Sequence, residues 1–289
     1  MIDLAVTTKA ESFERIRDPL AERGIRVRHV DPTGRAIPLS EPSSPWSASQ
    51  FDVGYVYPSR PMEGAVLDAA IDVSWVNDRD AVATSRNKAG VLASLDRACV
   101  PVPESVLVSN PADEPALVEA FERVGPPVVV KPNSTTRGVG VARADDLDSF
   151  LGLCDYLGLV HDFTATGDRS FLVQEYLPDA RDYRVMVVDG EYAGAVERRL
   201  PADAREAGRW KHNVHRGAAA TGVDLPAGLR EVAEDVAATL GISLLGVDLL
   251  VTADRAVVNE TNARPTIDEA EKYEPGFYDR LAALIETRT

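Results

Sequence analysis

The chain has 289 residues, of which 45% are hydrophobic and 27% are charged, and its formal net charge is −15. This composition is typical of a folded globular protein and excludes a disordered chain, a collagen-like fibre and a small disulfide-rich scaffold. The negative charge disfavours non-specific binding to nucleic acid or to an anionic membrane surface, so we expect neither as a partner.

Features that would direct the chain to a membrane or out of the cell are not found in the sequence. No apolar run approaches the roughly 20 residues that span a bilayer, and the first residues do not resemble a signal peptide. Cys99 and Cys154 cannot build a disulfide framework and are expected to be reduced, buried thiols. We therefore expect a cytoplasmic protein, and its acidic composition fits either a high-salt cytoplasm or an acidic, GC-rich-genome proteome.

The first part of the chain shows a β-α-β pattern. Residues 2–6 predict a strand, 10–23 an amphipathic helix and 25–30 a second strand. Such a unit favours a parallel sheet. A third strand is expected over 51–57 and a helix over 63–70. No Gly-x-Gly-x-x-Gly follows the first strand, so the dinucleotide-binding fingerprint is absent.

The rest of the chain predicts a mixed α/β (α+β) fold that becomes rich in strands. Asp189-Gly190 between two apolar runs indicates a tight β-hairpin. A domain boundary is expected near 80–110. Helices are predicted over 84–97, 111–124, 145–160, 226–240 and from about 276, and strands over 128–131, 171–177, 183–188, 191–197, 244–252 and 256–261.

Two carboxylates and an amide near the C-terminus form a candidate metal site. Asp248 lies within an apolar strand, where an unpaired carboxylate is costly. A hairpin loop over 253–255 would place Asp248 opposite Glu260, with Asn262 on the same face. Oxygen ligands of this kind suit Mg²⁺ or Mn²⁺. A salt bridge to Arg264 or a capping role is the alternative, and an even-numbered loop without a bulge would separate the two carboxylates.

Three further stretches are candidates for nucleotide binding. Lys131 ends an apolar strand before a small polar loop whose backbone could surround phosphates, although an ordinary turn has the same appearance. The strand 171–177 resembles a hinge that binds adenine, or an edge strand. Lys211 and His212 lie in a basic stretch near Arg198 that suggests an anion site, or surface charge pairing.

Taken in order, eight such stretches resemble the ATP-grasp superfamily, and within it the RimK-like carboxylate–amine ligase (glutamate ligase) group. The resemblance covers about residues 84–288. The matching stretches are Asn87-Lys88, Pro127–Asn133, Val173–Leu177, Asp182–Val185, Glu197–Arg199, Asn213–Gly217, Gly246–Leu250 and Asn259–Asn262.

The resemblance implies an ATP-grasp fold preceded by an α/β domain. On this basis we expect an N-terminal pre-ATP-grasp domain over 1–83 and an ATP-grasp domain over 84–289. The second domain would contain a small subdomain over about 110–177 that covers the nucleotide and a C-terminal metal-binding and catalytic subdomain over 178–289.

The resemblance also implies roles for individual residues. Arg198 would be catalytic, and two magnesium or manganese ions would bind to Asp248, Glu260 and Asn262. The glycines at 138 and 140 would let their loop close over phosphates. Because this loop departs from the family in having fewer glycines than many relatives, Arg137 could contact phosphate itself. The residues expected to bind ATP are Lys88, Lys131, Gly138, Glu175, Tyr176, Leu177, Asp182, Lys211, His212 and Asn213.

The implied function is ATP-dependent formation of an amide or peptide bond through an acyl-phosphate. The partners would be a small-molecule or peptide carboxylate and an amino acid such as glutamate, with a carrier protein as a further candidate and a homo-oligomer as the assembly. The alternatives are an ATP-grasp kinase that phosphorylates a hydroxyl and a non-catalytic ATP-binding regulatory module. Arg264 departs from the family pattern and could read a substrate carboxylate.

Overall fold

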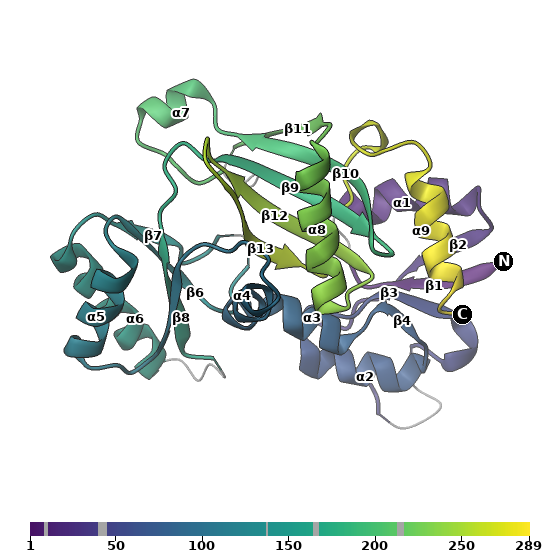
Figure 1. Ribbon diagram of the computed structural model, residues 1–289. Helices are drawn as coiled ribbons and strands as arrows, with labels where there is room; N and C mark the ends of the chain where they lie inside the picture. The colour runs from purple at the N-terminus through teal and green to yellow at the C-terminus, as the bar shows by residue number, and fades with distance from the viewer. Residues whose placement is uncertain (9–10, 40–44, 137, 164–167, 213–216) are drawn as a thin grey trace.

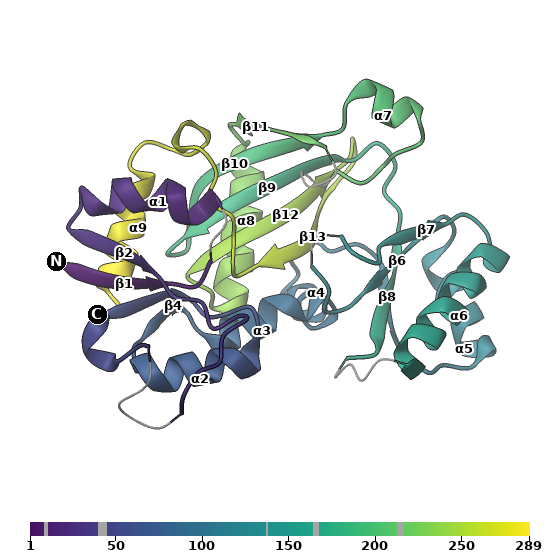
Figure 2. The same cartoon turned by 180° about the vertical axis from the view of Figure 1, so that it is seen from behind.

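The computed structural model describes residues 1–8, 11–39, 45–136, 138–163, 168–212 and 217–289. Within them the chain forms three β-sheets with helices packed on their faces (Figures 1 and 2). The three sheets are formed by successive parts of the sequence. The last helix of the chain then returns to pack beside the first sheet. Mixed α/β architecture was the sequence prediction, and it is confirmed.

The N-terminal unit is a parallel sheet in the order β2-β1-β3-β4. Its β-α-β beginning is as predicted, because β1 and β2 pair in parallel register, Ile2 beside Ile25. The short fourth strand was not predicted. The elements are β1 (Ile2–Val6), α1 (Glu11–Ala21), β2 (Ile25–His29), a 3-10 turn η1 (Ala48–Gln50), β3 (Val53–Val56), α2 (Pro61–Ile71) and β4 (Trp75–Asn77).

Two helices, rather than the single helix expected over 84–97, follow this sheet. They are α3 (Arg79–Arg86) and α4 (Lys88–Arg97), separated at Asn87. The Asn87 side chain accepts a hydrogen bond from the backbone N–H of Gly90 at 3.0 Å and so caps α4. Because of this break, Lys88 lies in the first turn of a new helix, next to the second sheet.

The second sheet is small and antiparallel, in the order β5-β8-β6-β7. Two helices cover one face, and their aromatic rings form a core separate from the other cores, with Phe121 and Phe150 at 5.1 Å between ring centroids. The edge strands β5 and β7 were not predicted. The elements are β5 (Ser105–Ser109), α5 (Glu114–Val124), β6 (Val128–Pro132), β7 (Ala142–Ala144), α6 (Leu147–Phe163) and β8 (Ser170–Glu175).

The third sheet is a five-stranded antiparallel sheet in the order β11-β10-β9-β12-β13. The predicted hairpin is confirmed, since Asp189 and Gly190 join β9 to β10 with φ values of 52° and 82°. Helix α8 packs on one face (Figure 1). The elements are β9 (Arg181–Val188), β10 (Glu191–Arg199), α7 (Ala202–Glu206), β11 (Ala219–Val223), α8 (Ala227–Leu240), β12 (Leu244–Val251) and β13 (Ala256–Asn262).

The β12–β13 hairpin reaches the predicted pairing by a different route. Val251 pairs with Ala256, so the loop has four residues, and the three-residue loop predicted over 253–255 is wrong. A β-bulge at Asn259 adds one residue to β13 and restores the register, so Asp248 pairs directly with Glu260. The even-numbered loop therefore does not separate the two carboxylates.

The last helix, α9 (Phe277–Glu286), follows a 3-10 turn η3 (Ala270–Lys272) and packs beside α1. Its buried residues Phe277, Leu281 and Ile285 share one apolar core with Leu4 and Ile16 of the N-terminal unit. The two ends of the chain consequently lie on the same side of the molecule (Figure 1).

Two other expectations concern membranes and thiols. Among the described residues, none of the helices combines the length and apolar character needed to cross a membrane.

Both cysteines are free, as expected, but only Cys154 is buried, and burial raises the pKa of its thiol to about 12. The prediction that Cys99 is buried is wrong, because it follows the end of α4 with a positive φ and its side chain is exposed.

Candidate active site

A cleft of about 1400 Å³ lies between the small sheet and the five-stranded sheet. Side chains of both sheets, of α3 and α4 and of the segment after β13 line it. The predicted site residues that the structure describes line this one cleft, except Gly140, which is not among its lining residues. Asn213 and Arg137 lie outside the described residues. The lining residues from the prediction are Lys88, Lys131, Gly138, Glu175, Tyr176, Leu177, Asp182, Arg198, Lys211, His212, Asp248, Glu260 and Asn262.

A row of charged residues crosses four neighbouring strands of the five-stranded sheet. Arg198 of β10 pairs with Asp182 of β9, Arg184 of β9 pairs with Asp248 of β12, and Asp248 pairs with Glu260 of β13. Residues paired in adjacent strands, or two apart in one strand, point to the same face of a sheet. The strand order alone therefore brings opposite charges together at the floor of the cleft.

Asp248 is the centre of this row. The Arg184 guanidinium donates to both of its carboxylate oxygens, at 2.7 and 2.8 Å, and Arg198 Nη2 lies 3.0 Å from Oδ2. Burial would raise the pKa of the Asp248 carboxyl, but the charges and hydrogen bonds of Arg184 and Arg198 outweigh it and lower the pKa to about 2. Asp248 is thus an anion held by two cations in an almost water-free position.

Asp182 occupies the other side of Arg198. Its Oδ1 accepts from Arg198 Nε at 3.0 Å and from Nη2, and His212 Nδ1 lies 3.9 Å from Oδ2. Burial and the nearby Asp248 charge raise the pKa of Asp182 to about 6, against the lowering effect of Arg198. Burial and the positive charge of Arg198 lower the pKa of His212, which favours the neutral imidazole.

The residues predicted to hold metal fit a hard divalent cation. Asp248 and Glu260 face each other across β12 and β13, and Asn262 follows on the same side. The Glu260 side chain makes no hydrogen bond or ion pair with another described residue, so its carboxylate oxygens are available. Across the described residues no group of three His, Cys, Asp or Glu side chains could hold a metal. The set here has two carboxylates and an amide, so other oxygen ligands would have to complete the coordination.

Two buried lysines face the acidic floor from the opposite wall. Lys131 Nζ lies 3.2 Å from Asn259 Oδ1, at the bulge of β13, and Lys88 Nζ donates to the backbone of Thr135. Burial lowers the pKa of Lys131 to about 8, although the Glu260 charge opposes this shift. Burial likewise lowers the pKa of Lys88. Two buried ammonium groups beside one carboxylate have capacity for a further anion.

The loop after Lys131 has backbone geometry that glycine permits. Gly138 and Gly140 have φ values of 66° and 76°, in the left-handed region. A Cβ at Gly140 would lie 2.8 Å from Pro132 Cγ. Lys211 donates to the Val141 carbonyl, which ties the segment after β10 to the end of this loop.

The predicted hinge connects the two sheets at the far end of the cleft. Glu175 Oε1 accepts from the backbone N–H of Glu104 at 2.8 Å, and Oε2 accepts from Arg255 in the β12–β13 loop. The carboxylate of Glu175 is therefore engaged within the protein. Tyr176 packs edge-on against Trp210 at 5.6 Å, and the Arg143 guanidinium lies 5.0 Å over the Tyr176 ring. These aromatic and main-chain groups form the cleft wall here.

Sequence reasoning gave no role to Arg184, which makes the shortest contacts to Asp248. The signal was present, because Asp182 and Arg184 are two apart in one strand and therefore share a face. What the sequence lacked was the pairing of β9 with β12, strands separated by more than 50 residues. Tyr176, Glu175 and Lys211, which also line the cleft, could be selected from the sequence because their motifs are local.

Comparison with known proteins identifies the family. Residues 85–276 match the RimK-like ATP-grasp domain. The ribosomal protein bS6–L-glutamate ligase of Escherichia coli O139:H28 is 32% identical over 206 residues, which are 68% of this chain and 62% of that protein. The chain thus spans about three fifths of the length of the curated relatives it matches.

Solved structures share the fold over nearly the whole chain. A RimK domain ATP-grasp protein from Sphaerobacter thermophilus has a TM-score of 0.68 at 22% identity, covering 98% of this chain and 99% of that one. The D-alanine–D-alanine ligase of Bacillus anthracis, solved with ATP, has a TM-score of 0.69 at 15% identity, covering 100% and 97%. The matched residues include both lysines and the whole charged row, and this chain belongs to the RimK-like ATP-grasp family.

Proposed function

We propose that this protein is an ATP-dependent carboxylate–amine ligase that forms an amide bond through an acyl-phosphate. The observation that carries the proposal is the single cleft in which Lys88 and Lys131 face Asp248 and Glu260, with Arg198 beside them. This arrangement offers positive charge for a phosphate chain, oxygen ligands for a divalent cation and a guanidinium for the reacting centre.

The nucleotide is assigned to the wall formed by the small sheet and the hinge. Adenine would pack near Tyr176 and Leu177 and bond to hinge main-chain groups, while Lys211 and His212 close that end. Asp182 Oδ2 faces His212 rather than Arg198 and is assigned to the ribose hydroxyls. Lys88 and Lys131 would bind phosphate oxygens as point charges, under the loop that contains Gly138.

Asp248, Glu260 and Asn262 would hold magnesium or manganese, as two ions. Bound there, the metal would neutralise phosphate charge and make the γ-phosphorus more electrophilic. Arg184 and Arg198 keep Asp248 ionised and oriented beforehand. The carboxylate therefore needs no proton release before it coordinates.

The reaction has two balanced steps. An oxygen of the substrate carboxylate attacks the γ-phosphorus, the bond to the β-phosphate oxygen breaks, and ADP and an acyl-phosphate form. The amine nitrogen then attacks the acyl carbon, the carbon–oxygen bond to phosphate breaks, inorganic phosphate leaves, and the nitrogen passes a proton to the released phosphate. Arg198 would stabilise the acyl-phosphate and the oxyanion that follows it. The 133–140 loop would exclude water that hydrolyses the intermediate.

We assign an amino acid as the amine and a small-molecule, peptide or carrier-protein acid as the carboxylate. Glutamate is the first amine to test, because the Escherichia coli relative is named as a glutamate ligase. The experiment is a screen for ADP release over carboxylic acids crossed with amino acids, with and without Mg²⁺. We expect release that requires acid, amine and metal together.

A pair of matched variants tests whether the ADP release measured in the screen depends on the cleft. Asp248→Asn should abolish ADP release, whereas Asp254→Asn, an exposed change in the adjoining loop, should preserve it. A stable phosphorylated alcohol as the product would replace the ligase by a kinase. Tight ATP binding without turnover under every mixture would replace it by a regulatory module.

A further inference from the structure

Two arginines lie at the end of the cleft where the N-terminal unit meets the charged row. Arg264 follows β13, two residues after Asn262, and Arg86 is the last residue of α3. Arg264 Nη1 donates to Thr7 Oγ1 at 3.0 Å and to the Tyr57 carbonyl. Arg86 Nη2 donates to the Ser59 carbonyl at 2.8 Å. Neutral groups of the N-terminal unit thus fix both guanidinium groups.

Neither guanidinium forms an ion pair with a carboxylate in the part of the chain that the structure describes. The other cationic groups of the cleft floor differ, because Arg181, Arg184 and Arg198 each bond to a carboxylate. Two cationic side chains that line one cleft without a carboxylate partner are stabilised when an anion binds to them.

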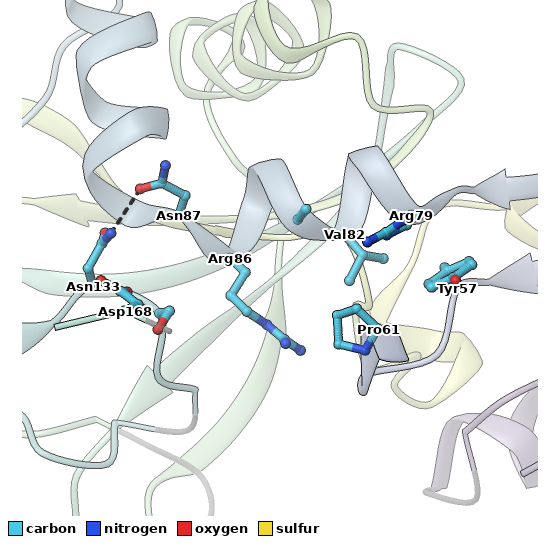
Figure 3. A pocket seen from close by; sticks show the side chains of 10 residues that line it. Tyr57, Pro61, Arg79, Val82, Arg86, Asn87, Asn133 and Asp168 are labelled. Carbon is cyan, nitrogen blue, oxygen red and sulfur yellow. Dashed lines mark hydrogen bonds between the residues drawn. The ribbon is translucent and has the colours of Figure 1, made fainter. Parts of the chain in front are cut away.

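A second pocket extends this region away from the metal ligands. It has a volume of about 350 Å³ and shares Arg86 and Val82 with the main cleft. Figure 3 shows Arg86 projecting from α3 toward Pro61, with Arg79 and Tyr57 farther along the same side. The pocket is lined by two arginines, Arg79 and Arg86, and by one carboxylate, Asp168. The end of the pocket that holds Arg79 and Arg86 therefore carries positive charge.

We propose that one substrate carries a carboxylate in addition to the group that reacts, and that Arg86 and Arg264 bind this second carboxylate. The inference rests on the proposed ligase function and specifies its substrates. Each guanidinium keeps N–H donors that its protein contacts do not use, and both side chains line the same cleft, so each has donors left for a substrate carboxylate. The remainder of such a substrate would extend past Arg86 into the second pocket.

The second carboxylate has two sources, which matched ligands distinguish. It belongs either to the acid that is activated or to the amino acid that supplies the amine. Glutarate against butyrate tests the first source, and L-glutamate against its diamide tests the second. Isothermal titration calorimetry on the intact chain with Mg²⁺ and a non-hydrolysable ATP analogue measures each affinity. We expect the carboxylate-bearing member of one pair to bind about tenfold to a hundredfold more tightly.

Substitutions then test whether Arg86 and Arg264 cause the preference for the carboxylate-bearing ligand. Arg264→Met and Arg86→Met should each reduce it to less than about threefold, since a charged hydrogen bond is lost. Arg97→Met, which removes an exposed arginine of α4 outside the cleft, should leave it unchanged. If Arg264→Met fails to fold because its contacts to Thr7 and Tyr57 are lost, Arg86→Met decides the matter.

The result that overturns the inference is a wild-type protein without a preference in either pair, or a preference that survives both substitutions. Failure of the ligase function gives a different pattern. In that case the wild-type protein still prefers the carboxylate-bearing ligand and the two substitutions still remove this preference. No combination of acid and amine, however, releases ADP.

Discussion

Removing the charge of Asp248 tests the central ion pairs of the site most directly. Asp248→Asn keeps the shape of the side chain but leaves Arg184 without its carboxylate partner, while Arg198 keeps Asp182. Arg184 is largely buried, so its charge would be exposed to little water after the substitution. We expect a large loss of stability in addition to the loss of turnover.

The magnitude follows from the pKa of Asp248. The lowered pKa means that the folded protein favours the charged form of Asp248, by an amount on the order of 2–3 kcal/mol at neutral pH. Breaking a buried pair typically costs about 3–5 kcal/mol, because the remaining charge stays buried. At about 2–4 °C per kcal/mol, the melting temperature should fall by at least about 5–10 °C.

Thermal unfolding of the variants at several pH values is the assay. Because folding lowers this pKa, the stabilisation is complete above the unfolded value and is lost as the pH falls toward about 2. The difference between wild type and Asp248→Asn should therefore shrink in acid. Asp254→Asn serves as the control and should change stability by less than about 0.5 kcal/mol.

A second substitution checks the cause. Asp248→Asn combined with Arg184→Gln removes both buried charges and should be more stable than Asp248→Asn alone. Equal melting temperatures for Asp248→Asn and Asp254→Asn at neutral pH, or a double variant that is less stable still, would refute the reasoning.

Three further predictions concern the proposed activity. Arg198→Ala should lower turnover by about 10²–10³ while nucleotide affinity changes far less; equal effects on both, measured by steady-state kinetics and calorimetry, would reject its assigned role. Nucleotide affinity should decline as the pH rises through about 8, where Lys131 loses its charge, and Lys131→Arg should abolish this dependence in a fluorescence titration. Gly140→Ala, whose Cβ would contact Pro132, should raise ADP release that is not coupled to amide formation. Gly125→Ala, with an equally positive φ but open space around it, should leave the ratio of ADP to amide unchanged in the same assay.

The local signals in the sequence predicted most of the elements. Asp189-Gly190 identified the β9–β10 hairpin because its backbone requires positive φ values at both positions. The predicted helix boundaries were wrong where a capping side chain determines the end of a helix. Asn87 divides the expected helix over 84–97 by capping α4, which composition and periodicity do not reveal.

Non-local pairing set the limit on predicting the site. Asp248 and Glu260 were placed together from a hairpin argument that assumed the wrong loop, and the bulge at Asn259 made the pairing correct. The partnership of Arg184 with Asp248 depends on β9 and β12 being neighbours, which no spacing along the chain specifies. Arg86 and Arg264 likewise line one cleft because α3 packs against β13, which no spacing along the chain specifies.

The position of α9 has a consequence for how the molecule is made. Leu4 of the first strand and Leu281 of the last helix lie in one apolar core, so this core is completed only after the intervening chain has been synthesised. During translation the parallel sheet of the N-terminal unit would emerge with this apolar face covered by α1 but not yet by α9. Contacts so distant in sequence slow folding, and they make chaperone binding to the nascent sheet an expected stage in its biogenesis.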